Sequence, residues 1–122
     1  MSYNIDAMKV KTCILTINQT DLESVIQEYH EPREYNKPDS NGGPWLLVVG
    51  EGAIEGTAKN GVMTITSIEC FGEGSGGDWL DVVVPILSKT TGTFEAILIW
   101  ERGDTIERVK VTNGKMTKKE VK

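Results

Sequence analysis

The chain has 122 residues, of which 39% are hydrophobic and 25% are charged, and this composition predicts one globular domain over residues 1–122 rather than a disordered chain. No apolar run approaches the ~20 residues that cross a bilayer, so no membrane contact is expected. The net charge of −5 combines a balance of −10 over residues 1–107 with +5 over residues 108–122. Because the acidic body repels phosphates, nucleic acid is not an expected partner.

The N-terminal third predicts a strand followed by a helix. Residues 8–17 are rich in β-branched and apolar types, which favour a strand. Thr20 and Glu23 have the spacing of a capping box, in which each side chain satisfies a free amide of the first helical turn. The apolar residues of 22–29 then recur at i, i+3, i+4 and i+7, which predicts an amphipathic helix.

The segment 30–44 contains three prolines and two glycines and predicts a loop of about fifteen residues, a length typical of functional or mobile loops. The apolar run of residues 45–51 then predicts a strand covered on both faces or placed centrally. Next, Asn60-Gly61 predicts a hairpin with a type I′ turn, because both turn residues need positive φ.

The C-terminal half predicts a second helix and three more strands. Residues 78–89 have a helical pattern, with Pro85 predicting a kink. Turns at Gly103-Asp104 and Asn113-Gly114 separate the last strands. The expected fold is therefore α+β: a mainly antiparallel sheet of about seven strands with two helices packed on it, in the order β-α-β-β-β-α-β-β-β. Residues 50–64 and 103–117 share a Gly-acid to Asn-Gly-x-Met-Thr pattern, which suggests a tandem pseudo-repeat or convergent hairpin chemistry.

The stretch "ECFGEGSGGDWL", residues 69–80, contains a G-x-G-x-x-G pattern between a predicted strand and a predicted helix. In a dinucleotide fold, such glycines admit a pyrophosphate to a helix N-terminus. Glu73 inside the motif, Asp78 at the start of the helix and the surrounding hairpins argue instead for a flexible corner, with Asp78 capping a helix that starts at Trp79. A possible ligand loop here comprises Glu73, Ser75, Gly76, Asp78 and Trp79, and no cofactor is predicted.

Arg33, Tyr35 and Trp45 are the predicted partner-binding residues, since arginine, tyrosine and tryptophan dominate interface hot spots. The alternative is a structural role, in which Tyr29 and Trp45 pack on the core while Arg33 pairs with a surface acid.

Other reactive residues have simpler explanations. His30 is the only histidine, so neither a metal site nor a histidine-dependent catalytic triad is predicted. Arg102-Gly103-Asp104 matches a cell-adhesion tripeptide but lies between two predicted strands and is interpreted as a turn. Cys13 and Cys70 fall in predicted strands and are expected in the core as free thiols. Because residues 1–11 contain no apolar signal segment, a cytoplasmic location is expected.

Two β-α-β-β-β sets in about 120 residues resemble the glyoxalase and dioxygenase group of paired modules, which bind a divalent metal in the cleft of a curved sheet through histidines and a glutamate. The resemblance rests on element order and length alone. The second set lacks its opening strand unless residues 62–71 serve both halves, and no metal ligand is carried over.

These patterns favour a non-enzymatic, acidic protein-interaction module, such as a bacterial or phage inhibitor, immunity or anti-defence protein, with a protein as its partner. A small-molecule or metal-binding protein or enzyme of the paired-module kind is the alternative, and a minor structural component of an assembly is a third. The sequence leaves the identity of the partner and the oligomeric state open.

Overall fold

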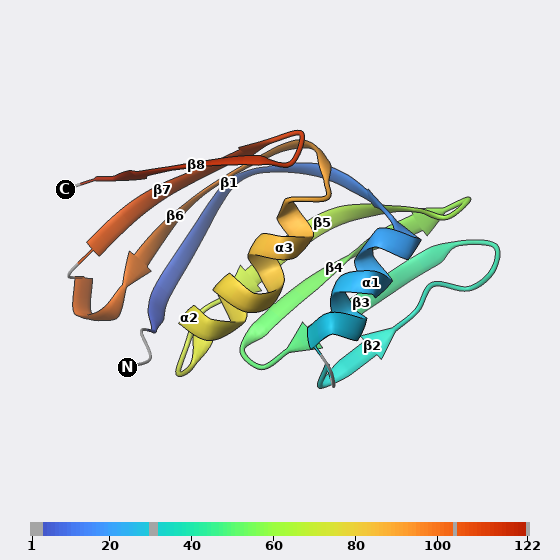
Figure 1. The fold of residues 1–122 in the computed structure, drawn as a ribbon, viewed down its shortest axis with the longest axis horizontal. Helices are drawn as coiled ribbons and strands as arrows, with labels where there is room; N and C mark the ends of the chain where they lie inside the picture. The colour runs from blue at the N-terminus through green and yellow to red at the C-terminus, as the bar shows by residue number, and fades with distance from the viewer. Residues whose placement is uncertain (1–3, 30–31, 104, 122) are drawn as a thin grey trace.

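The strands form one antiparallel sheet in the order β2-β3-β4-β5-β1-β6-β7-β8, as Figure 1 shows for the computed structural model, which describes residues 4–29, 32–103 and 105–121. The strands are β1 (Ile5–Asn18), β2 (Glu34–Asn36), β3 (Gly43–Val49), β4 (Gly52–Lys59), β5 (Val62–Cys70), β6 (Thr91–Trp100), β7 (Thr105–Thr112) and β8 (Lys115–Glu120). The helical elements are α1 (Gln19–Tyr29), α2 (Ser75–Asp78), the π-helix η1 (Trp79–Val83), α3 (Val84–Leu87) and the 3₁₀ turn η2 (Glu101–Gly103). The α+β prediction is confirmed, with eight strands instead of about seven.

The two Asn-Gly turns are hairpins of the predicted kind. Asn60 and Gly61 have φ values of 54° and 78°, and Asn113 and Gly114 have 48° and 81°. Positive φ at both central residues defines a type I′ turn, whose twist matches that of the flanking strands. These turns fix the registers of β4 with β5 and of β7 with β8.

The core lies between the sheet and the helices, which all cover the same face (Figure 1). Residues alternate along β3, so Trp45, Leu47 and Val49 are buried while their neighbours are more exposed. From the helices, Leu22 and Val25 of α1 meet this layer.

The second helix is continuous over residues 75–87 and passes through one π-helical turn. The amide of Val84 donates to the carbonyl of Trp79, five residues earlier, immediately before Pro85. A proline has no amide hydrogen to donate to the carbonyl four residues before it, and the wider π-turn accommodates this missing hydrogen bond. Where a kink was predicted at Pro85, the structure shows a π-helical turn within a continuous helix. The helix begins at Ser75 rather than Trp79, and Asp78 makes no capping hydrogen bond, so that prediction was wrong.

Two other local predictions need correction. The segment 30–44 is not one long loop, because β2 pairs with β3 and a bridge joins Asp39 to Gly42. Helix α1 begins at Gln19, one residue before the predicted cap, and the Glu23 carboxylate accepts hydrogen bonds from the side chains of Gln19 and Tyr35. Local sequence signals found both regions but did not show these long-range partners.

The two halves of the chain do not pair their strands in the same way. In the first half, β1 lies beside β5, so the first strand meets the last one. In the second half, β6 pairs with β1, and β8 forms the edge of the sheet. Residues 62–71, which would open a second module, contact none of β6, β7 or β8 as sheet neighbours. The shared hairpin pattern therefore reflects the same turn type in two differently placed hairpins.

Candidate functional site: a slot between β1 and β5

A slot opens in the middle of the sheet because β1 and β5 pair over only part of their length. Leu15 to Asn18 of β1 pair with Ile65 to Val62 of β5, and the pairing of the two strands ends there. At the far end, the amide of Gly72 donates to the carbonyl of Ile5 at 2.8 Å. Between these two closures β1 continues to pair with β6, and β5 with β4. The two strands therefore separate and rejoin.

A β-bulge lies at the point where the strands separate. In the register of β4 with β5, Glu55 faces Ser67 and Gly56 faces Ile65, so Thr66 is an extra residue in β5. A bulge bends its strand and increases the local twist. The Thr66 hydroxyl donates to the carbonyl of Glu55 at 3.2 Å. The bulge thus directs β5 away from β1 directly after Ile65.

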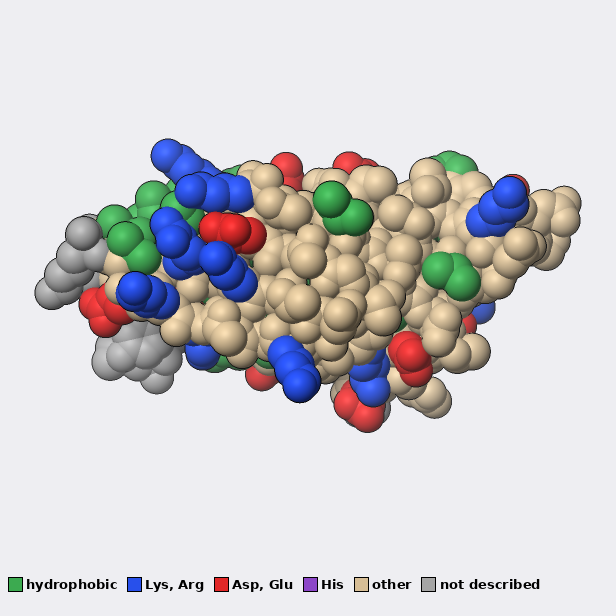
Figure 2. All heavy atoms as spheres, turned by 90° about the horizontal axis from the view of Figure 1, so that it is seen from above, with side chains coloured by type: hydrophobic (Ala, Val, Ile, Leu, Met, Phe, Trp, Pro, Cys, Tyr) green, Lys and Arg blue, Asp and Glu red, His purple; other side chains and the backbone are tan. Residues whose placement is uncertain are grey.

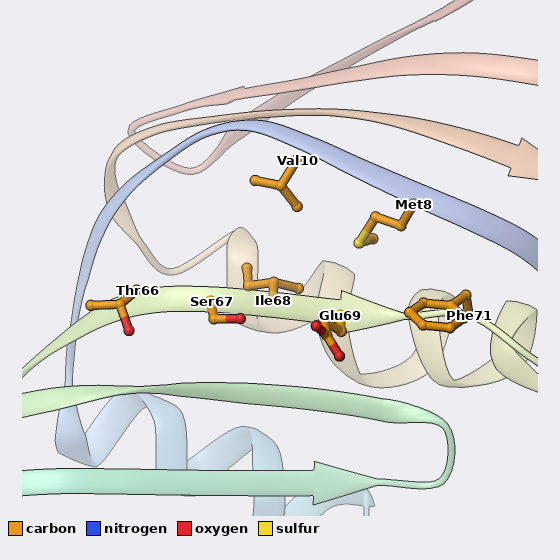
Figure 3. Close-up of a pocket in the computed structure, with 7 residues that line it drawn as sticks. All are labelled: Met8, Val10, Thr66, Ser67, Ile68, Glu69 and Phe71. Atoms are coloured by element: carbon orange, nitrogen blue, oxygen red, sulfur yellow. The ribbon is translucent and has the colours of Figure 1, made fainter.

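Seven residues line the slot, which has a volume of about 260 Å³: Met8, Val10, Thr66, Ser67, Ile68, Glu69 and Phe71. Figure 3 shows the side chains of Met8 and Val10 projecting from β1 toward the other five. Ile68 is 2% exposed and belongs to the core, whereas Val10 is 41% and Phe71 is 46% exposed. The lining is therefore mixed, with four apolar residues and three polar ones, and Glu69 is the titratable residue among them.

Cys13 lies near the end of the slot at which the pairing of β1 with β5 stops. Its thiol contacts the carbonyl of Ile65 at 3.5 Å, and burial raises its pKa. Cys70 is fully buried, donates to the carbonyl of Ser75 at 3.4 Å, and has its pKa raised to about 12, mainly by burial. Both cysteines are free thiols, as predicted. Cys70 belongs to the core, and Cys13 packs against it with partial exposure.

The glycine corner holds the start of β1. The hydroxyl of Ser75, which is fully buried, accepts from the amide of Ile5 at 2.7 Å and donates to the carbonyl of Gly72 at 2.6 Å. Beside it, the amide of Gly74 donates to Oδ1 of Asn4 at 2.8 Å. These polar groups bind the protein's own chain and clasp its N-terminal strand to the second helix.

The remaining residues of the predicted ligand loop do not converge on one site. Glu73 is exposed, Gly76 is buried, and Trp79 is 1% exposed in the core. The Asp78 carboxylate accepts from the hydroxyl of Tyr29 at 3.1 Å and from the amide of Glu51 at 2.8 Å. Asp78 therefore joins the second helix to α1 and to the turn between β3 and β4.

The predicted partner-binding residues are also separated. Trp45 is 3% exposed, with its indole donating to the carbonyl of Thr57 at 3.1 Å, so its assignment to a surface is corrected: it is a core residue. The half-buried Tyr35 donates its hydroxyl to Glu23 at 2.8 Å, and burial is the main cause of its raised pKa. Arg33 is exposed and donates to the carbonyl of Gly50 at 3.2 Å.

Three further positions concern metal binding and adhesion. His30 lies outside the described residues, and the part of the chain that the structure describes contains no cluster of metal-ligating side chains. Gly103 closes the turn η2 with a φ of 74°, while Asp104 lies outside the described residues.

None of the helices built from described residues has the length and apolar character needed to span a bilayer.

Sequence reasoning missed the slot, because its signal lies in pairing between strands far apart in the chain. Val10 and Phe71 resemble ordinary strand residues, and the bulge at Thr66 leaves no mark in a single sequence.

Searches against protein-family models, curated proteins and solved structures found no match to this chain.

Proposed function

We propose that this protein is a non-enzymatic protein-interaction module that receives an apolar side chain of its partner in the slot between β1 and β5. The observation that carries the proposal is the exposure of Val10 and Phe71 on either side of a gap in the sheet. Large apolar side chains around a depression are typical of the anchor pockets of interfaces.

The size and chemistry of the slot favour a side chain over a free ligand. Its volume of about 260 Å³ is below the range of ~300–1,000 Å³ that is usual for small-molecule clefts. General acid–base catalysis usually divides its roles between two titratable groups, and the lining supplies Glu69 alone. An aromatic or branched aliphatic side chain is small enough to enter and would cover the exposed rim.

The two free thiols are consistent with action in the cytoplasm, where cysteines stay reduced. An inhibitor, immunity or anti-defence protein of bacterial or phage origin is the kind of module that we propose. Such proteins act by covering a partner's surface, which requires a docking face and no reaction centre.

A photo-crosslinking experiment tests this assignment. Benzoylphenylalanine replaces Phe71 in one variant and Leu80 in a matched control, and each is irradiated in a lysate of the organism that encodes the protein. Leu80 is 55% exposed and lies on the second helix, away from the slot, so both probes are similarly accessible. We expect a discrete protein adduct from position 71 and none of the same mass from position 80.

A second variant confirms that the adduct depends on the slot. Val10→Glu places a charge at its rim and should remove the adduct formed at position 71, while the melting temperature stays close to that of the parent. Equal labelling from positions 71 and 80, or no adduct at position 71, would refute the proposed function.

A further inference from the structure

Basic residues gather on the last two strands of the sheet. Arg108 and Lys110 of β7 and Lys115, Lys118 and Lys119 of β8 lie there, and four of them line a shallow hollow of about 330 Å³. Figure 2 shows lysine and arginine side chains clustered toward one end of the molecule around an acidic side chain. Within this cluster, Arg108 forms an ion pair with Glu95 at 3.7 Å.

Strand β8 forms an edge of the sheet, so one of its sides has no strand neighbour among the described residues. The turn at Asn113-Gly114 pairs Thr112 with Lys115, and the amide of Val121 donates to the carbonyl of Ile106 at 2.6 Å. Odd-numbered residues of this segment therefore direct their amides toward β7. Because amides alternate along a strand, those of Met116, Lys118 and Glu120 face outward.

We propose that β8 accepts an extended acidic segment of a partner protein as a ninth strand of the sheet. The outward amides supply the main-chain donors that strand addition requires. Opposite charges on facing strands stabilise the pairing, whereas like charges destabilise it. The three lysines of β8 therefore disfavour pairing between two copies of this edge and favour a strand that carries carboxylates.

A protein segment fits this edge better than a nucleic acid does. The residues that line the hollow are cationic or hydroxylic, and they include no aromatic ring on which a base could stack. Glu95 already places a carboxylate among the cations, facing Lys110 across the ladder. A nucleic acid also offers no extended peptide backbone to accept from the outward amides.

The inference rests on the protein being an interaction module but uses a surface separate from the slot. Its test is fluorescence anisotropy with a labelled octapeptide of alternating threonine and glutamate. The same peptide with glutamine in place of glutamate, and a labelled oligothymidylate, are the comparison probes.

Two variants at position 118 distinguish the contribution of the backbone amide from that of the side-chain charge. Lys118→Pro and Lys118→Thr remove the same charge, but only proline removes the outward amide, and proline is tolerated on an edge where that amide faces solvent. We expect Lys118→Pro to bind the glutamate peptide at least about tenfold more weakly than Lys118→Thr. Amide exchange of the unmodified protein should slow at Met116, Lys118 and Glu120 when the peptide is added.

A charge-reversal pair tests the sign of the partner. Lys115→Glu with Lys119→Glu should weaken peptide binding at least about tenfold. Lys37→Glu with Lys59→Glu makes the same change in net charge at exposed positions in the β2–β4 half of the sheet, far from β8 in the strand order, and should weaken binding less than about threefold. The glutamine peptide should bind more weakly than the glutamate peptide.

Three results would overturn the proposal: no binding of the glutamate peptide, equal affinities of the proline and threonine variants, or tighter binding of oligothymidylate. Peptide binding should survive Val10→Glu. If position 71 forms its adduct and the peptide does not bind, the proposed function stands and the β8 inference fails. If the peptide binds as expected without that adduct, only the slot assignment fails.

Discussion

The Ser75 hydroxyl provides the clearest prediction about stability. It is fully buried and accepts the amide of Ile5, which is itself fully buried at the start of the longest strand. In Ser75→Ala that amide loses its hydrogen bond to the hydroxyl, whereas the carbonyl of Gly72 keeps the hydrogen bond from the backbone amide of residue 75 at 3.2 Å. One buried donor is therefore left without an acceptor.

Leaving a buried donor unpaired costs about 1–3 kcal/mol, so we expect Ser75→Ala to lower the free energy of unfolding by about 2 kcal/mol. For a chain of this size the melting temperature should fall by roughly 6–10 °C. Urea unfolding measures the free energy, and an unchanged denaturant slope would show that the folded state keeps its extent of buried surface. Hydrogen exchange at Ile5 should also become faster.

Ser88→Ala is the matched control. Ser88 also donates to a carbonyl three residues earlier, at 2.6 Å from that of Pro85, but it is exposed. Water can replace that hydrogen bond, so the expected cost is within about 0.5 kcal/mol. If Ser75→Ala costs no more than Ser88→Ala, the Ser75 hydroxyl does not hold the N-terminal strand in the way inferred.

Three other predictions concern packing, pH dependence and thiol reactivity. Gly56→Ala forces a Cβ into a backbone carbonyl of β5 and should lower the free energy of unfolding by about 2–3 kcal/mol. Gly77→Ala places its Cβ in open space on a helix and should raise the free energy of unfolding by about 0.5–1 kcal/mol; urea unfolding measures both. Burial opposes ionisation of Glu23, yet hydrogen bonds that include the Tyr35 hydroxyl outweigh it and lower its pKa below 4.5. The ionised carboxylate therefore stabilises the fold above pH 4.5, and this stabilisation is lost as the pH falls through the lowered pKa. Tyr35→Phe should lower the free energy of unfolding by about 1 kcal/mol at pH 7 and by less in acid. A cost that stays constant with pH would contradict this. Cys70, buried and with its pKa raised to about 12, should resist a thiol reagent at pH 8 until urea unfolds the chain, and rapid labelling of the native protein would show that the core opens locally.

Local chemistry explains why much of the fold could be predicted. Positive φ at Asn60 and Asn113 is encoded by two adjacent residues, and the buried face of α1 by spacings of three and four. Such signals need no knowledge of distant partners. The short strand β2 was missed because three residues between prolines carry no periodicity, and it forms only by pairing with β3.

The candidate site could not be predicted for the opposite reason. Trp45 resembles an interface anchor in sequence, but the alternation of β3 directs it into the core, where its indole finds the carbonyl of Thr57. Ser75 resembles a phosphate ligand in a glycine loop until the amide of Ile5, seventy residues away in sequence, is seen beside it. Composition indicates which side chains suit a ligand, whereas only the fold shows which of them are already engaged.

The slot itself results from two structural constraints on β5. At Gly56 a Cβ would lie 1.8 Å from the carbonyl oxygen of Thr64, so the absence of a side chain allows β4 and β5 to approach closely just before the bulge. The extra residue Thr66 then bends β5 away from β1, while the bond between Gly72 and Ile5 brings the chain back. Regular pairing over the same length would have covered Val10 with a neighbouring strand. Because both closures are hydrogen-bonded, the gap is held open by the fold, which is the property that a preorganised anchor pocket requires.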